Sequence, residues 1–93
     1  METALPDFEV YPNPTTGELT LNWLSAGESY TNIRVFNALG EQMVLLQKII
    51  SEATTQLDIS HLADGIYTIQ LTTSGGIPLS KRIVLAKTGR QKP

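Results

Sequence analysis

Cysteine is absent from this chain of 93 residues, which excludes disulfides, a thiol nucleophile and a cysteine-based zinc site. Long apolar runs are also absent, because none approaches the roughly 20 residues that a membrane-spanning helix requires. The glycine motifs of phosphate-binding loops do not occur. Residues 1–4 lack the basic and apolar regions of a signal peptide, so we expect any export signal to be encoded elsewhere. The sequence therefore predicts a domain without a cofactor.

Acidic residues are absent from the last third of the chain. All nine lie at or before Asp64 beside two basic residues, so residues 1–64 carry a net charge of −7. The five basic residues that follow give residues 65–93 a charge of +5. The simpler interpretation is mutual neutralisation in the folded domain, and the alternative is a basic end that docks on an acidic receptor. Basic residues this few, without interleaved aromatics, argue against a nucleic acid partner.

Short alternating segments separated by turn residues run through the sequence and predict strands. In one of them the alternation places Leu19, Leu21 and Trp23 on one face. Residues 42–50 are ambiguous, because a helix also fits their apolar content, but the turn before them favours the return strand of a hairpin. The predicted strands are residues 8–11, 18–23, 30–37, 42–50, 56–60, 66–73 and 79–86.

Seven short antiparallel strands in a chain of this length favour an all-β, immunoglobulin-like sandwich of two sheets. The cysteine pair of antibody domains is missing. We expect one domain at residues 7–87, with an N-terminal linker at 1–6 and a flexible tail at 88–93. Leu62 is expected to enter the core where the chain crosses between two strands.

Asp58, Ser60, His61 and Asp64 have the residue types of a hydrolytic triad or a metal site. A triad assembles in a pocket from distant segments, whereas these residues all lie at the exit of one strand. We therefore interpret the carboxylates and Ser60 as partners of turn amides, and His61 as a surface residue. Calcium at Asp58 or Asp64 is a weak alternative. No catalytic, cofactor-binding or metal residue is predicted.

Aromatic side chains could instead form a platform on which sugars stack, and Tyr11, Trp23, Tyr30 and Tyr67 are the candidates. Trp23 and Tyr67 share their predicted faces with aliphatic residues, so core packing is the better interpretation for both. One of the two functions that we consider is nevertheless that of an accessory module, carbohydrate-binding or adhesive, attached to an extracellular enzyme.

A series of short motifs resembles one protein family in order and spacing, from about residue 10 to residue 87. These are the type A C-terminal sorting domains of type IX (Por) secretion in Bacteroidetes-type bacteria. The motifs are Tyr11-Pro12-Asn13-Pro14 with Gly17, residues 33–37 with Gly40, Leu57 to Ser60 with Leu62, Gly65-Ile66-Tyr67, and Gly76 with residues 81–84.

The resemblance implies a secretion signal behind a cargo domain, without enzymatic activity. It implies transit through the periplasm, recognition by the outer-membrane translocon and its shuttle proteins, and cleavage by a sortase-like cysteine peptidase. The cargo would end at the cell surface or be secreted. No membrane insertion is expected.

Recognition in that family depends largely on the last strand and the terminus. We expect the last strand to lie near a sheet edge, with two adjacent basic side chains on opposite sides. The candidate recognition residues are Lys81, Arg82, Ile83, Val84 and Lys87, and the structural motif residues are Pro12, Asn13, Pro14, Gly17, Gly40, Leu62, Gly65 and Tyr67.

Overall fold

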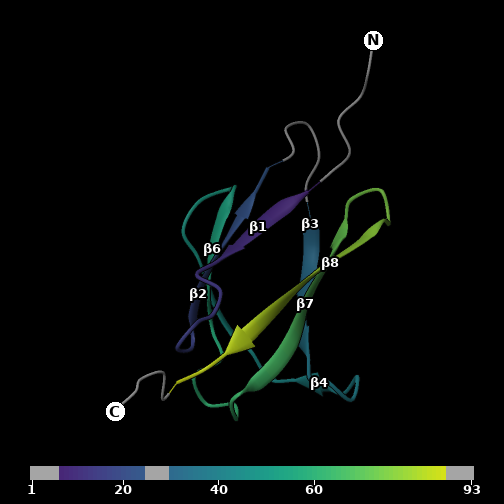
Figure 1. The fold of residues 1–93 in the computed structure, drawn as a ribbon. Coiled ribbons are helices and arrows are strands. Elements are labelled where there is room, and N and C mark those ends of the chain that lie inside the picture. The colour runs from purple at the N-terminus through teal and green to yellow at the C-terminus, as the bar shows by residue number, and fades with distance from the viewer. Residues whose placement is uncertain (1–6, 25–29, 88–93) are drawn as a thin grey trace.

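Two four-stranded antiparallel sheets enclose one hydrophobic core in the computed structural model, which describes residues 7–24 and 30–87 (Figure 1). The first sheet has the strand order β1-β2-β6-β5 and the second has the order β4-β3-β7-β8. The strands are β1 Phe8–Tyr11, β2 Glu18–Trp23, β3 Tyr30–Phe36, β4 Gln42–Met43, β5 Leu46–Ile49, β6 Thr54–Asp58, β7 Gly65–Thr73 and β8 Pro78–Leu85.

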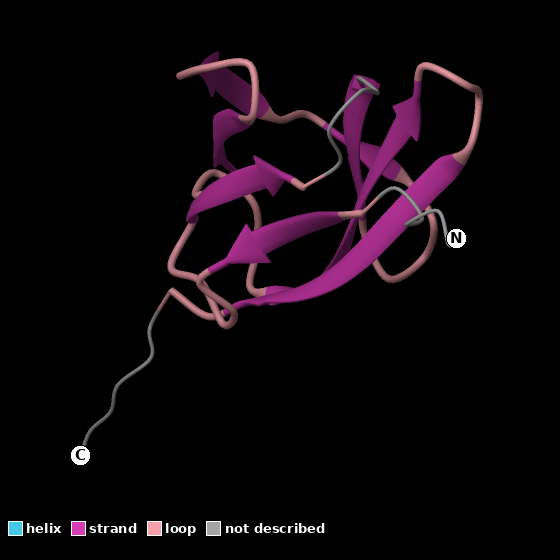
Figure 2. Cartoon of the chain, turned by 90° about the horizontal axis from the view of Figure 1, so that it is seen from above, coloured by secondary structure: helices cyan, strands magenta, loops and turns pink. Residues whose placement is uncertain are grey.

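The described residues form no helix (Figure 2). Accordingly, they include no helix that is long and apolar enough to cross a membrane. The expected linker at 1–6, a predicted loop at 25–29 and the expected tail at 88–93 lie outside the described residues.

The core forms where the alternating strands of both sheets turn their apolar side chains inward. Leu19, Leu21 and Trp23 are buried on one face of β2, as predicted, while β7 contributes Ile69 and Leu71. Burial of one such side chain stabilises the fold by roughly 1.5–3 kcal/mol. The remaining core residues are Phe8, Val35, Leu57, Ile59, Leu62, Tyr67, Ile83 and Leu85.

Tyr30 links the two sheets at one end of this core. Its ring lies 5.2 Å from that of Trp23, centroid to centroid, in a tilted arrangement. A hydrogen bond of 2.8 Å joins the hydroxyl groups of Tyr30 and Thr55. Tyr30 belongs to β3, whereas Trp23 belongs to β2 and Thr55 to β6 of the other sheet. These contacts therefore join the two sheets.

The prediction of a single strand over residues 42–50 is wrong, and the described part of the chain forms eight strands instead of seven. β4 pairs with β3 in one sheet, whereas β5 pairs with β6 in the other. The chain crosses between the sheets at Val44, which is 71% exposed, and Leu45, which packs against the core. A corner of this kind lets one apolar segment serve both sheets, which explains why its residues do not alternate. The His61 ring contacts the Val44 carbonyl at 2.8 Å and braces the corner.

Candidate functional site: the edge of the last strand

β8 forms an edge of the second sheet, because only β7 flanks it. The predicted position of the last strand is therefore confirmed. Ile83 and Leu85 are buried in the core, whereas Arg82 and Val84 alternate to the outer face and are exposed. The five candidate recognition residues thus divide between core and surface.

Lys81 points to the core side of the sheet although its side chain is exposed. It lies opposite the buried Ile69 of β7, so its stem starts on the inner face. Its ammonium group reaches the Asp7 carboxylate at 3.3 Å and lies 5.9 Å from the centre of the Phe8 ring. Arg82 faces the opposite side, as predicted. An inward-facing charge on an edge strand opposes the addition of another strand at that point.

The outer edge of β8 is covered along its C-terminal half by residues 13–15. The Asn13 side chain accepts a hydrogen bond from the Val84 amide (2.9 Å) and donates one to the Arg82 carbonyl (3.2 Å). Thr15 pairs with the strand through its backbone, since its amide bonds the Val84 carbonyl and its carbonyl accepts from Ala86, both at 2.9 Å. The opening motif therefore acts as a short substitute strand (Figure 1). The Tyr11–Pro12 and Asn13–Pro14 peptide bonds are cis.

Thr15 and Gly17 hold this opening loop in place. Thr15 is 1% exposed, and its hydroxyl donates to the Glu18 carbonyl (2.8 Å) and accepts from the Gly17 amide (3.0 Å). Gly17 has a φ of 134°, and a β-carbon there would lie 2.5 Å from that of Ser60. The Ile59 amide bonds the Gly17 carbonyl at 2.8 Å. Glycine is therefore required by close approach as well as by conformation.

Lys87, the last described residue, forms hydrogen bonds with the turn before β7. The Lys87 ammonium group donates to the carbonyls of Ser60, at 3.0 Å, and Leu62. The Lys87 amide donates to the Asp64 carboxylate at 3.1 Å. In the same turn Leu62 is buried, as predicted, and the Tyr67 hydroxyl donates to the Ala63 carbonyl at 2.5 Å. Lys87 thus holds the segment that follows β8 against this turn.

A groove of about 450 Å³ lies on the outer face of the second sheet, beside Arg82. It is lined by Phe36, Asn37, Ala38, Gly40, Ile66, Thr68 and Arg82. Asn37 shapes its rim, because its side chain accepts from the amides of Leu39 and Glu41, both at 2.9 Å. Arg82 is the single charged residue among the described residues of the lining, so the groove favours an anionic group.

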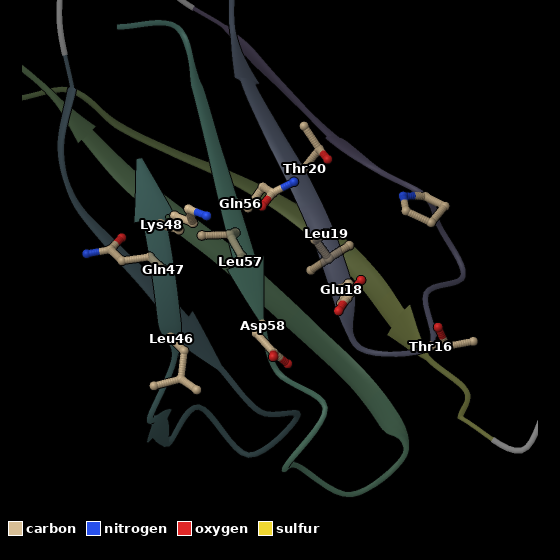
Figure 3. Close-up of a pocket in the computed structure, with 11 residues that line it drawn as sticks. Thr16, Glu18, Leu19, Thr20, Leu46, Gln47, Lys48, Gln56, Leu57 and Asp58 are labelled. Carbon is tan, nitrogen blue, oxygen red and sulfur yellow. The ribbon is translucent and has the colours of Figure 1, made fainter. Parts of the chain in front are cut away.

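A second groove, of about 580 Å³, lies on the outer face of the first sheet (Figure 3). Leu46 and Lys48 of β5 line it together with Glu18 of β2 and Asp58 of β6. Among the residues that the structure describes, no aromatic side chain lines this groove. Of the candidate stacking residues, Trp23 and Tyr67 are buried and Tyr30 is partly buried, which leaves Tyr11 exposed. These positions do not favour a sugar platform.

The polar residues that follow β6 do not converge on a reactive centre. The Asp58 carboxylate accepts from the Ser60 hydroxyl (2.6 Å) and amide (2.9 Å), and these bonds hold the pKa of Asp58 below its ordinary value. His61 contacts Val44, and Asp64 bonds Lys87 instead of an amide of its own turn. Within residues 7–24 and 30–87 there is no group of three or more side chains able to hold a metal ion.

Asn13 and Thr15 are the residues whose importance for the β8 edge the sequence did not reveal. The available signal was a carboxamide between two prolines. Such a side chain presents one acceptor and two donors, so it can pair with an exposed peptide group much as a neighbouring strand does. The strand it pairs with lies 71 residues away, and no local pattern identifies it.

Residues 9–86 match the family described as the secretion system C-terminal sorting domain. The match covers most of the chain, and the chain belongs to this family. The domain is therefore a C-terminal sorting signal of type IX secretion, as the resemblance implied. Such a signal acts with the type IX secretion machinery on an attached N-terminal cargo, and the exported protein ends at the cell surface or is secreted. Neither a curated protein nor a solved structure matches the chain.

Proposed function

We propose that the type IX translocon and its shuttle proteins read this domain at β8, through Lys81, Arg82, Ile83, Val84 and Lys87. In this proposal the domain passes through the periplasm and acts without catalysis. A sortase-like cysteine peptidase then removes it, and the cargo stays at the cell surface. The observation that carries the proposal is the division of the β8 edge into a covered half and an open half.

The open half follows from the alternation of hydrogen bonds in an antiparallel strand. Both backbone groups of Val84 point away from β7, toward Asn13 and Thr15. By alternation, the groups of Arg82 and Ser80 point the same way. Among the described residues, the Asn13 side chain donates a hydrogen bond to the Arg82 carbonyl. The Arg82 amide and the amide and carbonyl of Ser80 have no hydrogen-bond partner among these residues. A partner can therefore bond these backbone groups beside Arg82, while the inward-facing Lys81 opposes the addition of a full strand.

The side-chain contacts of Lys81, Arg82, Ile83 and Lys87 assign these four residues unequal roles, while Val84 contributes the backbone groups that Asn13 and Thr15 bond. Ile83 is buried and acts through the fold. The ammonium groups of Lys81 and Lys87 already bond within the domain. Arg82 is exposed beside the open backbone groups and lines the groove of the second sheet. We assign it the main contact, a carboxylate of the partner, because guanidinium binds carboxylates in two-pronged geometry.

The test is secretion of a reporter cargo carrying this domain, in cells with and without the translocon. Lys81→Ala combined with Arg82→Ala is expected to lower secretion about tenfold, the loss that one charge-assisted contact predicts. Arg34→Ala, which removes an exposed arginine from β3, is the matched control and should secrete normally. Normal secretion of the folded double variant would contradict recognition through β8.

We also infer that the sandwich is immunoglobulin-like. With β4 set aside, the orders β1-β2-β6-β5 and β3-β7-β8 correspond to strands ABED and CFG of that fold. The bond from the Tyr67 hydroxyl back to Ala63, at the start of β7, resembles its tyrosine corner. An experimental structure tests the inference, because a different strand order would contradict it.

A further inference from the structure

We propose that β5 is a second docking site, which binds an extended segment of another protein as an added strand, with an acidic residue of that segment opposite Lys48. β5 lies at the edge of the first sheet, away from β8, which belongs to the second sheet. All four of its side chains are exposed, including Leu46 at 58% and Ile49 at 75%. The site is thus independent of the one proposed on β8.

Among the four sheet edges of the described chain, β5 has the least protection against an added strand. β4 is only two residues long, and β1 carries Glu9 and is followed directly by Pro12. β8 is covered by residues 13–15, begins at Pro78 and carries the inward-facing Lys81. Devices of this kind keep strand edges from pairing. Among the described residues nothing covers β5, which contains no proline and has large apolar side chains, so the charge of Lys48 is its single device of this kind.

The backbone of β5 offers a regular set of bonding groups. The Ile50 amide donates to the Thr54 carbonyl of the neighbouring hairpin arm at 2.9 Å, so its backbone faces β6. By alternation, the amides and carbonyls of Gln47 and Ile49 face the open side. Gln47 lies opposite the buried Leu57, so these two residues turn their side chains to the core side. An added strand would cover the exposed Ile49 with an apolar residue there.

Lys48 decides between a second copy of this chain and a different partner. It lies on the outer face opposite Gln56, in the one charged position of the strand. If two copies paired antiparallel with Lys48 opposite Lys48, two ammonium groups would face each other. If they paired with Gln47 opposite Gln47, Lys48 would lie opposite Leu46 of the other copy. Opposite charges across strands attract and like charges repel. The chemistry therefore selects a foreign strand with an acid opposite Lys48, apolar residues on its core side and no positive charge.

The experiment uses the complete chain and a short synthetic peptide in which valine alternates with threonine, with one glutamate placed to face Lys48. Hydrogen exchange at single amides, followed by NMR, reports the binding site. We expect the peptide to slow exchange at Gln47 and Ile49 and to leave Ser80 and Arg82 unchanged. Absence of protection at Gln47 and Ile49 would overturn the proposal. If the amides of Gln47 and Ile49 became protected as the protein concentration rose, with no peptide present, the chain would be pairing with itself. That result would also overturn the proposal.

Two substitutions separate backbone pairing from general adhesion. Gln47→Pro removes an open-side donor without breaking a bond to β6, and it should weaken peptide binding roughly two- to tenfold. Lys48→Glu should weaken binding by up to about fivefold, and a peptide with lysine in place of glutamate should restore it. Circular dichroism confirms that each variant is folded. Unchanged binding to folded Gln47→Pro, or failure of the charge exchange to restore binding, would contradict the proposed strand.

Discussion

The Asn13 side chain bonds the amide of Val84 at 2.9 Å and the carbonyl of Arg82 at 3.2 Å. These contacts join the opening motif of the domain to its last strand. Two of the segments that carry the family resemblance are therefore parts of one structural edge. The opening motif limits which backbone groups along the edge of β8 remain open.

Asn13→Ala is expected to uncover the part of the β8 edge that the Asn13 side chain covers. The Val84 amide and Arg82 carbonyl would lose their partner, and stability should fall by about 1 kcal/mol, the net value of such hydrogen bonds. Faster hydrogen exchange at Val84 and a lower midpoint of urea unfolding are the measurements. Asn13→Asp is the comparison, because it keeps an acceptor for Val84 but cannot donate to Arg82. Unchanged exchange at Val84 in the alanine variant would contradict the covering role.

Gly17→Ala is expected to be much more destabilising than Gly76→Ala. Both glycines have positive φ, 134° and 88°, so both replacements are strained. Only at Gly17 would the new β-carbon also strike a neighbour, at 2.5 Å from the β-carbon and 2.7 Å from the α-carbon of Ser60. We expect a loss above about 2 kcal/mol at Gly17 and of about 1 kcal/mol at Gly76. Chemical denaturation measures both, and equal losses would show that the contact with Ser60 is unimportant.

Tyr67→Phe is expected to destabilise the domain by about 1 kcal/mol while its fold is retained. The ring stays in the core, but the Ala63 carbonyl loses the hydroxyl that bonds it at 2.5 Å. Tyr11→Phe is the matched control, because Tyr11 is 47% exposed, and its removal of a hydroxyl should cost little. Thermal unfolding of the two variants provides the comparison. Equal melting temperatures for Tyr67→Phe and the unmodified chain would contradict a stabilising role.

Asp58 is expected to make stability depend on pH in the acidic range. Its pKa is lowered first by the Ser60 hydroxyl and then by the Ser60 amide. A lowered carboxyl pKa stabilises the fold above about pH 4, and this contribution is lost as the pH falls through the lowered pKa. Ser60→Ala removes the main cause and should raise the pKa of Asp58 toward its ordinary value. NMR titration of the carboxyl carbon tests this, with Ser80→Ala as a control that should leave Asp58 unchanged.

Much of the fold could be predicted because strand alternation is a local property. The spacing of two positions predicts one buried face for Leu19, Leu21 and Trp23, and all three are buried in the structure. Residues 42–50 could not be divided correctly, because four successive apolar residues fit a strand in either sheet. Their pairing is decided by β3 and β6, the strands that flank them in the two sheets.

The sequence by itself determined most of the strand pattern, most of the core and the family, since each rests on spacing along the chain. Only the tertiary structure decided which strands lie at edges and what covers them. Asn13 meets Val84, Lys81 meets Asp7 and Lys87 meets Leu62 because the sheets bring distant segments together. Two of the three candidate cations consequently bond within the domain. Arg82 stands beside the open half of β8 because strand order, and not local sequence, places it there.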